Sequence, residues 1–187
     1  MLTKLSLMIQ KIVSKEASRF TLNGIFITDK ECVATDSHRL TRVKHLSVQD
    51  KMDGHVVLKS ADAVFLSKMA GKEPIEVIES NAAEISFRAG ANKTTFEPLE
   101  GRFPDYLRII PSKTDDHICI TFNPKMMKDL MEIHGAADDC VRMYVHPRNP
   151  NSNAIILESA REDGQDVQSL LMPVREAAGY QARRYSV

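Results

Sequence analysis

Three consecutive residues, Asp36, Ser37 and His38, have the side-chain types of a hydrolytic triad. Neighbouring side chains point apart in a strand or turn, so these three cannot form a triad through adjacency alone. The sequence also contains no GxSxG or HExxH motif and no glycine-rich loop of the kind that holds phosphates. We therefore expect no catalytic residues and a protein that is not an enzyme.

The histidines and cysteines, which are common metal ligands, show no spacing typical of a metal site. An odd number of scattered cysteines provides no disulfide framework and favours a reducing cytoplasm as the location. We expect no metal and no cofactor. The residues concerned are His38, His45, His55, His117, His134, His146, Cys32, Cys119 and Cys140.

The composition is that of a soluble globular chain. Its 187 residues are 43% hydrophobic, and 25 basic and 25 acidic side chains give a net charge of zero. This length suits one ordinary domain or two small ones. Neutrality argues against binding nucleic acid through a bulk basic surplus, although it leaves room for a local basic face. No stretch reaches the ~20 apolar residues of a membrane span, and the N-terminus is not typical of a signal peptide.

The elements that position any site recur in the order strand, helix, three strands. The first copy lacks its leading strand and begins with a predicted amphipathic helix over 3–16, because Leu5, Met8, Ile9 and Ile12 recur at helical spacing. Alternating apolar residues predict strands at 20–28 and 39–45, and a further strand is predicted at 31–35, directly after the turn formed by Asp29 and Lys30.

The second copy begins with a strand at 55–59 and a helix at 60–71, with Ser60 as its cap and Gly71 at its end. Its three further strands are predicted at 74–80, 83–89 and 93–99.

The third copy begins with a strand at 117–123 and a helix at 123–136, with Asn123 as its cap and Pro124 in its first turn. Its remaining strands are predicted at 140–146, 153–159 and 167–174.

This order predicts an α+β fold in which helices cover one face of antiparallel sheets. The first two repeats can close a core together, whereas the third has no partner in the chain. We expect a two-repeat domain over 1–110, a half domain over 111–175 and a flexible tail over 176–187. The tail contains a glutamine followed four residues later by an aromatic at 181–185.

Three strings, VATDSHRL (33–40), EGRFPDYLRIIP (100–111) and LLMPVR (170–175), occur in this order. They resemble the signatures of the beta subunit of bacterial DNA polymerase III, the sliding clamp. The resemblance covers residues 3–175 and corresponds to the middle domain plus the last half of the third domain. Where the family has glycine in its first string, this chain has Ser37, which is costly if the turn needs a left-handed backbone.

The resemblance implies a pocket that receives short peptides from polymerases and clamp loaders. Leucine, methionine and proline would form an apolar floor, while arginine and histidine would hold carbonyls or an amide. Without the family match, the same positions read as ordinary strand-end and core residues. The residues implied are Thr35, His38, Arg39, Leu40, Pro104, Arg108, Ile109, Leu170, Leu171, Met172, Pro173, Val174 and Arg175.

The resemblance also implies a helix-lined face that contacts double-stranded DNA non-specifically. Its lysines are equally compatible with the ordinary solvated side of a helix. They are Lys4, Lys11, Lys15, Lys68, Lys72, Lys125 and Lys128.

The function implied is that of a DNA replication processivity factor, a small cytoplasmic clamp that assembles around DNA. A family ring contains twelve repeats, so four chains of three repeats would be needed, most simply joined head to tail. The alternative is a peptide-binding module that competes for clamp partners without encircling DNA. A fragment, or a product of an internal start, is a third possibility.

Overall fold

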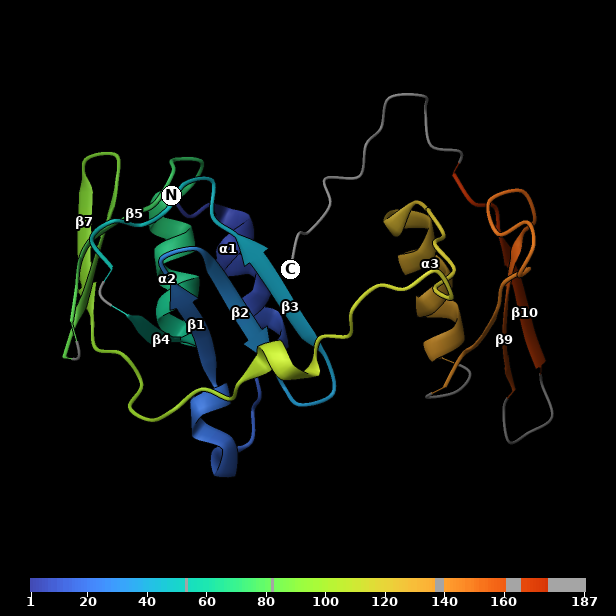
Figure 1. Cartoon of the computed structure of the whole chain (residues 1–187), viewed down its shortest axis with the longest axis horizontal. Helices are drawn as coiled ribbons and strands as arrows, with labels where there is room; N and C mark the ends of the chain where they lie inside the picture. Colours follow the sequence, from blue (N-terminus) through green and yellow to red (C-terminus); the bar gives the residue numbers. More distant parts are fainter. Residues whose placement is uncertain (53, 82, 137–139, 161–165, 175–187) are drawn as a thin grey trace. The chain divides into compact units, whose positions relative to one another are not determined.

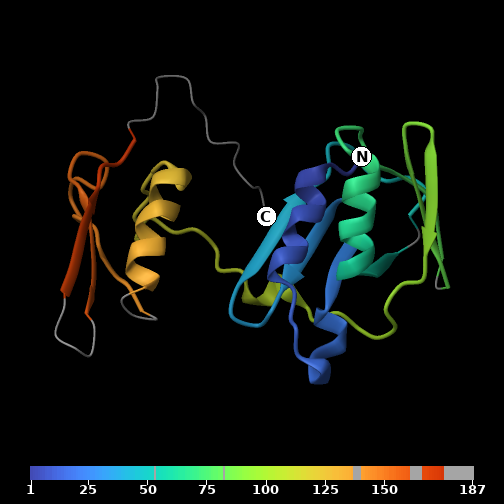
Figure 2. The same ribbon diagram turned by 180° about the vertical axis from the view of Figure 1, so that it is seen from behind.

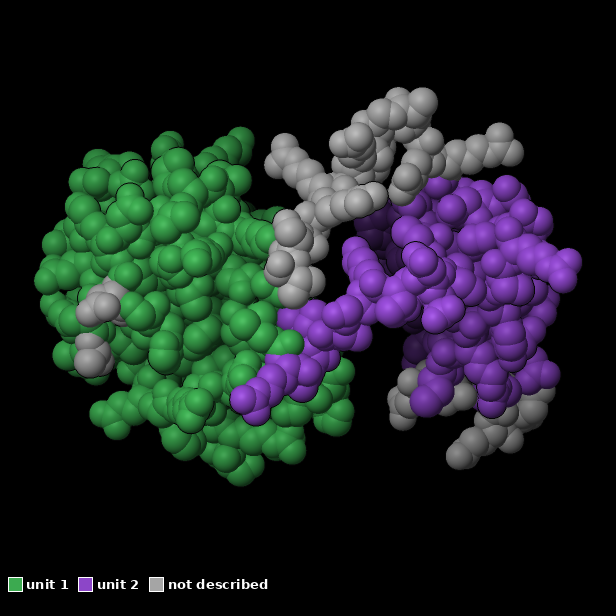
Figure 3. Space-filling view, in the orientation of Figure 1, with its two compact units in different colours: residues 1–107 green, residues 108–187 purple. Residues whose placement is uncertain are grey.

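The computed structural model describes residues 1–52, 54–81, 83–136, 140–160 and 166–174. The chain divides into two compact units, residues 1–107 and 108–187, which are green and purple in Figure 3. Each combines helices with antiparallel strands, which confirms the predicted α+β fold class. None of the helices in the described residues combines the length and apolar character that a membrane span requires.

Unit 1 contains repeats one and two. Repeat one runs from α1 (Lys4–Met8) through the 3₁₀ turns η1 (Ile9–Ile12) and η2 (Ala17–Leu22) to β1 (Gly24–Thr28), β2 (Glu31–Thr35) and β3 (Leu40–Lys44). Repeat two comprises β4 (His55–Lys59), α2 (Ser60–Ala70), β5 (Glu76–Ser80), β6 (Ile85–Ala89) and β7 (Asn92–Phe96). In both views, α1 and α2 lie side by side on one face of the sheet (Figures 1 and 2).

The two repeats are joined by a strand that crosses between them. The first sheet has the order β3-β2-β1-β4, so the strand that leads repeat two completes the sheet of repeat one. The second sheet has the order β5-β6-β7. A core of mostly aliphatic side chains lies between the sheets and the helices, with Leu58 and the aromatic Phe87 both fully buried. Cys32 is also fully buried, and burial raises the pKa of its thiol, so this cysteine is a packing residue.

Unit 2 contains repeat three. Its helix α3 (Pro124–Gly135) precedes a sheet of order β10-β9-β8, formed by β8 (Arg142–Tyr144), β9 (Ile155–Ala160) and β10 (Asp166–Leu171). The predicted cap is confirmed, because the side chain of Asn123 accepts a hydrogen bond from the Lys125 N–H at 2.9 Å. The buried apolar cluster of this unit is small: Ile155, Leu157 and Leu171.

The predicted helix over 3–16 is wrong in its length and in its buried face. The α-helix ends at Met8 and a 3₁₀ turn continues only to Ile12. Leu5 and Met8 are exposed, whereas Leu7 is buried. The winding tightens to 3₁₀ after Met8, so a spacing of 3.6 residues does not continue from α1 into η1. Within α1 itself, the face packed on the core carries Leu7 rather than Leu5 and Met8.

Two other expectations at element boundaries are corrected. Residues 20–22 belong to the 3₁₀ turn η2, and the strand predicted over 20–28 begins only at Gly24. Ser60 is the first residue of α2 rather than its cap, and the N-cap is Lys59. The Ser60 hydroxyl instead donates to the Gln10 side chain at 3.2 Å, which ties the start of α2 to η1.

The strand predicted over 117–123 is absent, since no strand is assigned to these described residues. Its counterpart β4 is a strand because it pairs along the whole of β1, which belongs to the other repeat. The third repeat has no second repeat in the described part of unit 2, so this segment lacks the strand that would give it a ladder.

Candidate functional site

The string VATDSHRL forms the end of β2 and a tight turn into β3. The Asp36 carboxylate accepts hydrogen bonds from the N–H groups of His38 and Arg39, both at 3.0 Å, and from Arg39 Nε at 2.9 Å. Thr35 Oγ1 accepts the N–H of Ser37 at 3.1 Å and donates to the Arg39 carbonyl at 2.8 Å. The threonine and aspartate therefore fix the turn from both sides.

This turn presents basic side chains to solvent. His38 and Arg39 are exposed, Leu40 is half-buried and Thr35 is buried. Partial desolvation acts to raise the pKa of the Asp36 carboxyl, but the hydrogen bonds from His38 and Arg39 hold the pKa below its usual value. The carboxylate therefore stays ionised, and the turn keeps its shape at neutral pH.

Ser37 has a φ of 79°, so it occupies the left-handed region that the sequence pointed to. Replacing Ser37 with glycine is expected to raise the free energy of unfolding by up to about 1 kcal/mol, because glycine has no Cβ to strain there. Urea unfolding of Ser37→Gly checks this. Ser37→Ala is the control and should give no gain, since alanine keeps the Cβ. A gain of equal size in both variants would contradict the strain argument.

The string EGRFPDYLRIIP leaves β7 and crosses the outer face of the first sheet. Phe103 and Tyr106 are buried against Phe26 of β1, with ring centroids 4.7 and 5.9 Å from that of Phe26. Pro104, between them, is exposed. The segment leads into the 3₁₀ turn η3 (Tyr106–Ile109). The two aromatic residues thus anchor the segment and leave Pro104 facing outward.

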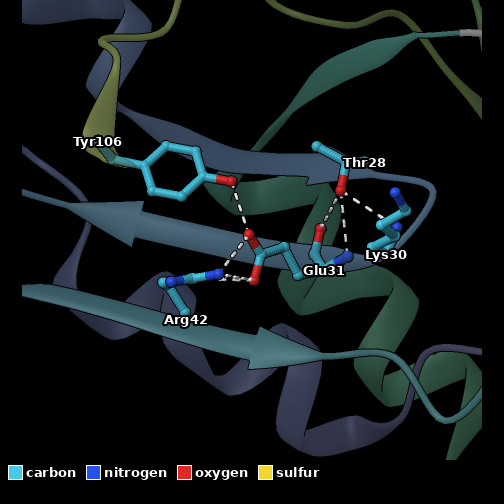
Figure 4. A network of polar contacts seen from close by, with 5 residues as sticks. All are labelled: Thr28, Lys30, Glu31, Arg42 and Tyr106. Carbon is cyan, nitrogen blue, oxygen red and sulfur yellow. Dashed lines mark hydrogen bonds and ion pairs between the residues drawn. The ribbon is translucent and has the colours of Figure 1, made fainter. Parts of the chain in front are cut away.

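A buried polar network holds this anchor in place (Figure 4). The Tyr106 hydroxyl donates to Glu31 Oε1 at 2.7 Å, and Arg42 donates to both Glu31 oxygens at 3.0 Å. Burial and the Glu31 carboxylate raise the pKa of Tyr106, so the phenol remains a donor. Thr28 supports the same strand, because its hydroxyl accepts the N–H of Glu31 at 3.1 Å. The start of the connection to unit 2 is therefore fixed by an ion pair and a hydrogen bond.

The third string runs along β10 and past its end. Leu170 and Met172 are both 63% exposed, whereas Leu171, between them, lies in the core of unit 2. Pro173 is half-buried, and Val174 donates its N–H to the carbonyl of Thr121 at 2.8 Å. Alternation along the strand thus presents two large apolar side chains to solvent.

The predicted pocket residues lie in both units. Five of them lie in unit 1: Thr35, His38, Arg39, Leu40 and Pro104. The exposed Arg108 and Ile109 lie at the start of unit 2, and the third string belongs to unit 2 at β10. In both views the segment 100–107 lies next to the β2–β3 turn (Figures 1 and 2). Arg175, the tail 176–187 and its segment 181–185 lie outside the described residues. As a pocket, this set remains a prediction.

The residues Phe26, Glu31 and Arg42 support the site and were not predicted. Glu31 of β2 lies opposite Lys44 of β3, and Arg42, two residues before Lys44, is its diagonal neighbour, a position from which a long side chain still reaches a cross-strand partner. That pairing was readable in the sequence once the hairpin was assigned. The contact with Tyr106, 75 positions away from Glu31, was not.

The predicted DNA-facing lysines are all exposed, and three of them converge. Lys4, Lys11 and Lys68 line one groove of about 270 Å³ between α1 and α2. Lys128 of α3 forms an ion pair with Glu132 at 3.3 Å. The helix layer of unit 1 therefore carries a local basic face, which the zero net charge of the whole chain conceals. Lys15, Lys72 and Lys125 do not line this groove.

Together these features define a class: repeats of a helix and three antiparallel strands, paired by a crossing strand, with basic residues on the helix layer. No protein-family model matches the chain. The chain does resemble the beta sliding clamps of bacterial DNA polymerase III, as a shortened, clamp-like form.

Curated relatives match in sequence over part of their length. The beta sliding clamp of Caulobacter vibrioides is 31% identical over 111 residues, which cover 53% of this chain and 29% of that protein. The clamp of Streptococcus pneumoniae is 33% identical over 129 residues, which cover 64% and 32%. The match thus spans about a third of the curated relatives.

Solved structures extend the likeness in fold to nearly the whole chain. The beta subunit of Streptococcus pyogenes superposes with a TM-score of 0.71 at 23% identity, covering 93% of this chain and 49% of that one. The sliding clamp of Bartonella birtlesii, bound to griselimycin, gives 0.69 at 24% identity, covering 94% and 51%. The fold is therefore that of about half a sliding-clamp chain.

Proposed function

We propose that the protein is a small sliding-clamp-like processivity factor of DNA replication, which assembles from several copies around double-stranded DNA. The observation that carries the proposal is the clamp fold over nearly the whole chain, combined with the basic groove between α1 and α2. Lysines that contact phosphates give non-specific, salt-sensitive binding, which allows a ring to slide. The protein would act by binding rather than by catalysis, in the cytoplasm.

The proposal includes a peptide-binding pocket for polymerases and clamp loaders. Exposed Leu170 and Met172 offer the apolar surface, and exposed Arg39 and His38 offer polar contacts. Met is well suited to partners of varied sequence because its side chain is flexible and polarisable. We infer that the buried network around Tyr106 positions the part of the pocket contributed by the segment 100–107.

The test is retention on circular DNA. Protein bound to a nicked circular duplex should remain bound at a salt concentration that removes it from the same DNA after linearisation, because only a closed ring is held by topology. Equal loss from circular and linear DNA would contradict a ring.

The alternative is a module that binds clamp partners without encircling DNA. The open sheet of repeat three favours it, since an unfinished repeat cannot close a ring by itself. This module would bind clamp-binding peptides and would show no difference between circular and linear DNA. The same experiment, with a fluorescent peptide added, therefore separates the two functions.

A further inference from the structure

The sheet of repeat three is open at β8. Within the described residues, β8 has a strand on one edge only. Its central residue Met143, which lies opposite the buried Leu157, is 48% exposed. The inward residues at the same place in the first strands of repeats one and two, Ile27 and Val77, are 0% and 5% exposed. The core of repeat three is therefore incomplete beside β8.

Unit 1 shows how such an edge is covered when two repeats pair. β4 leads repeat two and pairs antiparallel with β1 of repeat one, placing Leu58 opposite Ile25. The segment that leads repeat one pairs with repeat two in the same way, at a single residue. Leu2, which precedes α1, forms a β-bridge with Ile75, just before β5. Backbone hydrogen bonds of 2.8 and 3.0 Å join Leu2 and Ile75 in both directions. The segment that leads each repeat therefore belongs to the sheet of the other repeat.

In repeat three, the segment 117–123 occupies the position that β4 occupies in repeat two. Phe122 directly precedes the N-cap of α3, as Leu58 directly precedes that of α2. Ile120 and Phe122 alternate toward the core and pack against the buried cluster of unit 2. The segment thus has the alternation and the position of a strand without a strand beside it.

One backbone hydrogen bond occurs at the same position in both units, and it shows which edge of the segment 117–123 corresponds to which edge of β4. Val174 donates its N–H to the carbonyl of Thr121 at 2.8 Å, and Leu99 donates in the same way to Val57 at 2.8 Å. In unit 1, the opposite edge of β4 is the one that pairs with β1. The opposite edge of the segment 117–123 is therefore the one that corresponds to a pairing edge.

We propose that two copies of the chain complete each other's third repeat, each adding its segment 117–123 as an antiparallel strand to β8 of the other copy. The register follows from unit 1, because Val141 precedes Met143 as Ile25 precedes Ile27. Phe122 of one copy then lies opposite Val141 of the second.

Two further pairs follow from the antiparallel register. Ile120 faces Met143 of the second copy, which covers the exposed side of that methionine, and Cys119 faces Tyr144. All the inward-facing pairs are apolar on both sides. This interface is self-complementary under a two-fold axis, which is the commonest symmetry of protein dimers.

The third repeat of another copy is the partner that fits, because it supplies both missing parts at once. It offers a leading strand to β8 of the first copy, and its own open β8 to the segment 117–123 of the first copy. The edge of β5 in unit 1 is the competing acceptor. There the N–H of Val77 already donates to the Gln49 side chain at 3.3 Å, and Leu2 bridges the preceding Ile75. That edge is partly covered within the chain, whereas β8 is not covered within the described residues.

Disulfide trapping in the full chain tests the register. Directly opposed antiparallel residues have Cα atoms about 4.5–5.5 Å apart, which suits a disulfide. In a Cys140→Ser background, Tyr144→Cys should form a covalent dimer through Cys119 under mild oxidation. The link should be lost when Cys119→Ser is added. Tyr144 is 48% exposed, so the substitution leaves the core unchanged.

The matched control is Ile78→Cys, which stands in β5 where Tyr144 stands in β8. A dimer from Tyr144→Cys and none from Ile78→Cys supports the proposal. A dimer from Ile78→Cys alone assigns the segment to the β5 edge and overturns it. No dimer from either variant, with circular dichroism showing both folded, also overturns it.

Light scattering of the unmodified chain gives a second measurement. The mass should be at least twice the 21.0 kDa of one chain at micromolar concentration, and a stable monomer would overturn the proposal. The proposal takes from the proposed function only that copies assemble. Retention on circular DNA without the predicted disulfide would reject this interface and leave the proposed function standing.

Discussion

Replacing Glu31 with alanine is expected to lower the free energy of unfolding by about 3 kcal/mol, the largest effect on stability expected from a polar residue of unit 1. The side chains of Glu31 and Arg42 are 9% and 18% exposed in their ion pair, so water cannot replace the lost carboxylate easily. The variant leaves Tyr106 without the acceptor of its 2.7 Å hydrogen bond.

The loss should extend beyond β2 and β3. Tyr106 packs on Phe26 and lies 5.7 Å from the Arg42 guanidinium, so the network ties the segment 100–107 to the sheet. Once Glu31 is removed, that segment should open before the rest of unit 1. We expect faster amide hydrogen exchange there and a fall in the urea midpoint of about 1.5 M, if unit 1 unfolds with a typical slope of ~2 kcal/mol per M.

The matched control is Glu76→Ala, which removes another cross-strand ion pair in unit 1. Glu76 and Arg88 are 44% and 53% exposed, so solvent screens the pair and its loss should lower the stability far less than the loss of Glu31. If both variants lose the same stability, burial is not the reason for the Glu31 effect. Tyr106→Phe should fall between them, because it removes one hydrogen bond and keeps the ring.

Most elements were predictable because the signals that define them are local. The cap at Asn123, the glycine that ends α2 and the short runs of strand-forming residues in β2 and β4 depend on neighbours within a few residues. The predicted length of the first helix was wrong because its winding changes after Met8, and no periodic pattern in the sequence indicates that change. The strand predicted over 117–123 was wrong for another reason. A strand needs a partner strand, and alternation in one segment cannot reveal whether that partner is present.

The candidate site was predictable only as far as the three strings carried it. They located the β2–β3 turn, where Ser37 stands in place of the family's glycine and has a positive φ. The buried network of Glu31, Arg42 and Tyr106 depends on a contact across 75 positions, which follows from the folded sheet alone. The convergence of lysines from α1 and α2 likewise requires that the two helices lie side by side.

Removing the lysines that line the groove between α1 and α2 is expected to have the largest effect on function, through the loss of DNA binding. The triple variant Lys4→Ala, Lys11→Ala, Lys68→Ala should reduce association with duplex DNA more than tenfold at about 0.15 M salt. Each phosphate contact contributes about 0.9 to the slope of log K against log salt, so the slope should become shallower by about 2.7 for each chain bound. Fluorescence anisotropy with labelled duplex, measured over a range of salt concentrations, gives both values.

The effect must come from position rather than from charge, since three lysines fewer make any neutral protein acidic. The control is Lys30→Ala, Lys51→Ala, Lys93→Ala, which removes the same charge from exposed residues that do not line the groove. Bulk attraction would make both triples equally weak, which would contradict a DNA-facing groove. A specific loss in the first triple, with unchanged circular dichroism, would instead show that a neutral chain binds DNA through one local face. That result explains how zero net charge is compatible with a clamp, because a ring that encloses DNA needs only a thin basic lining.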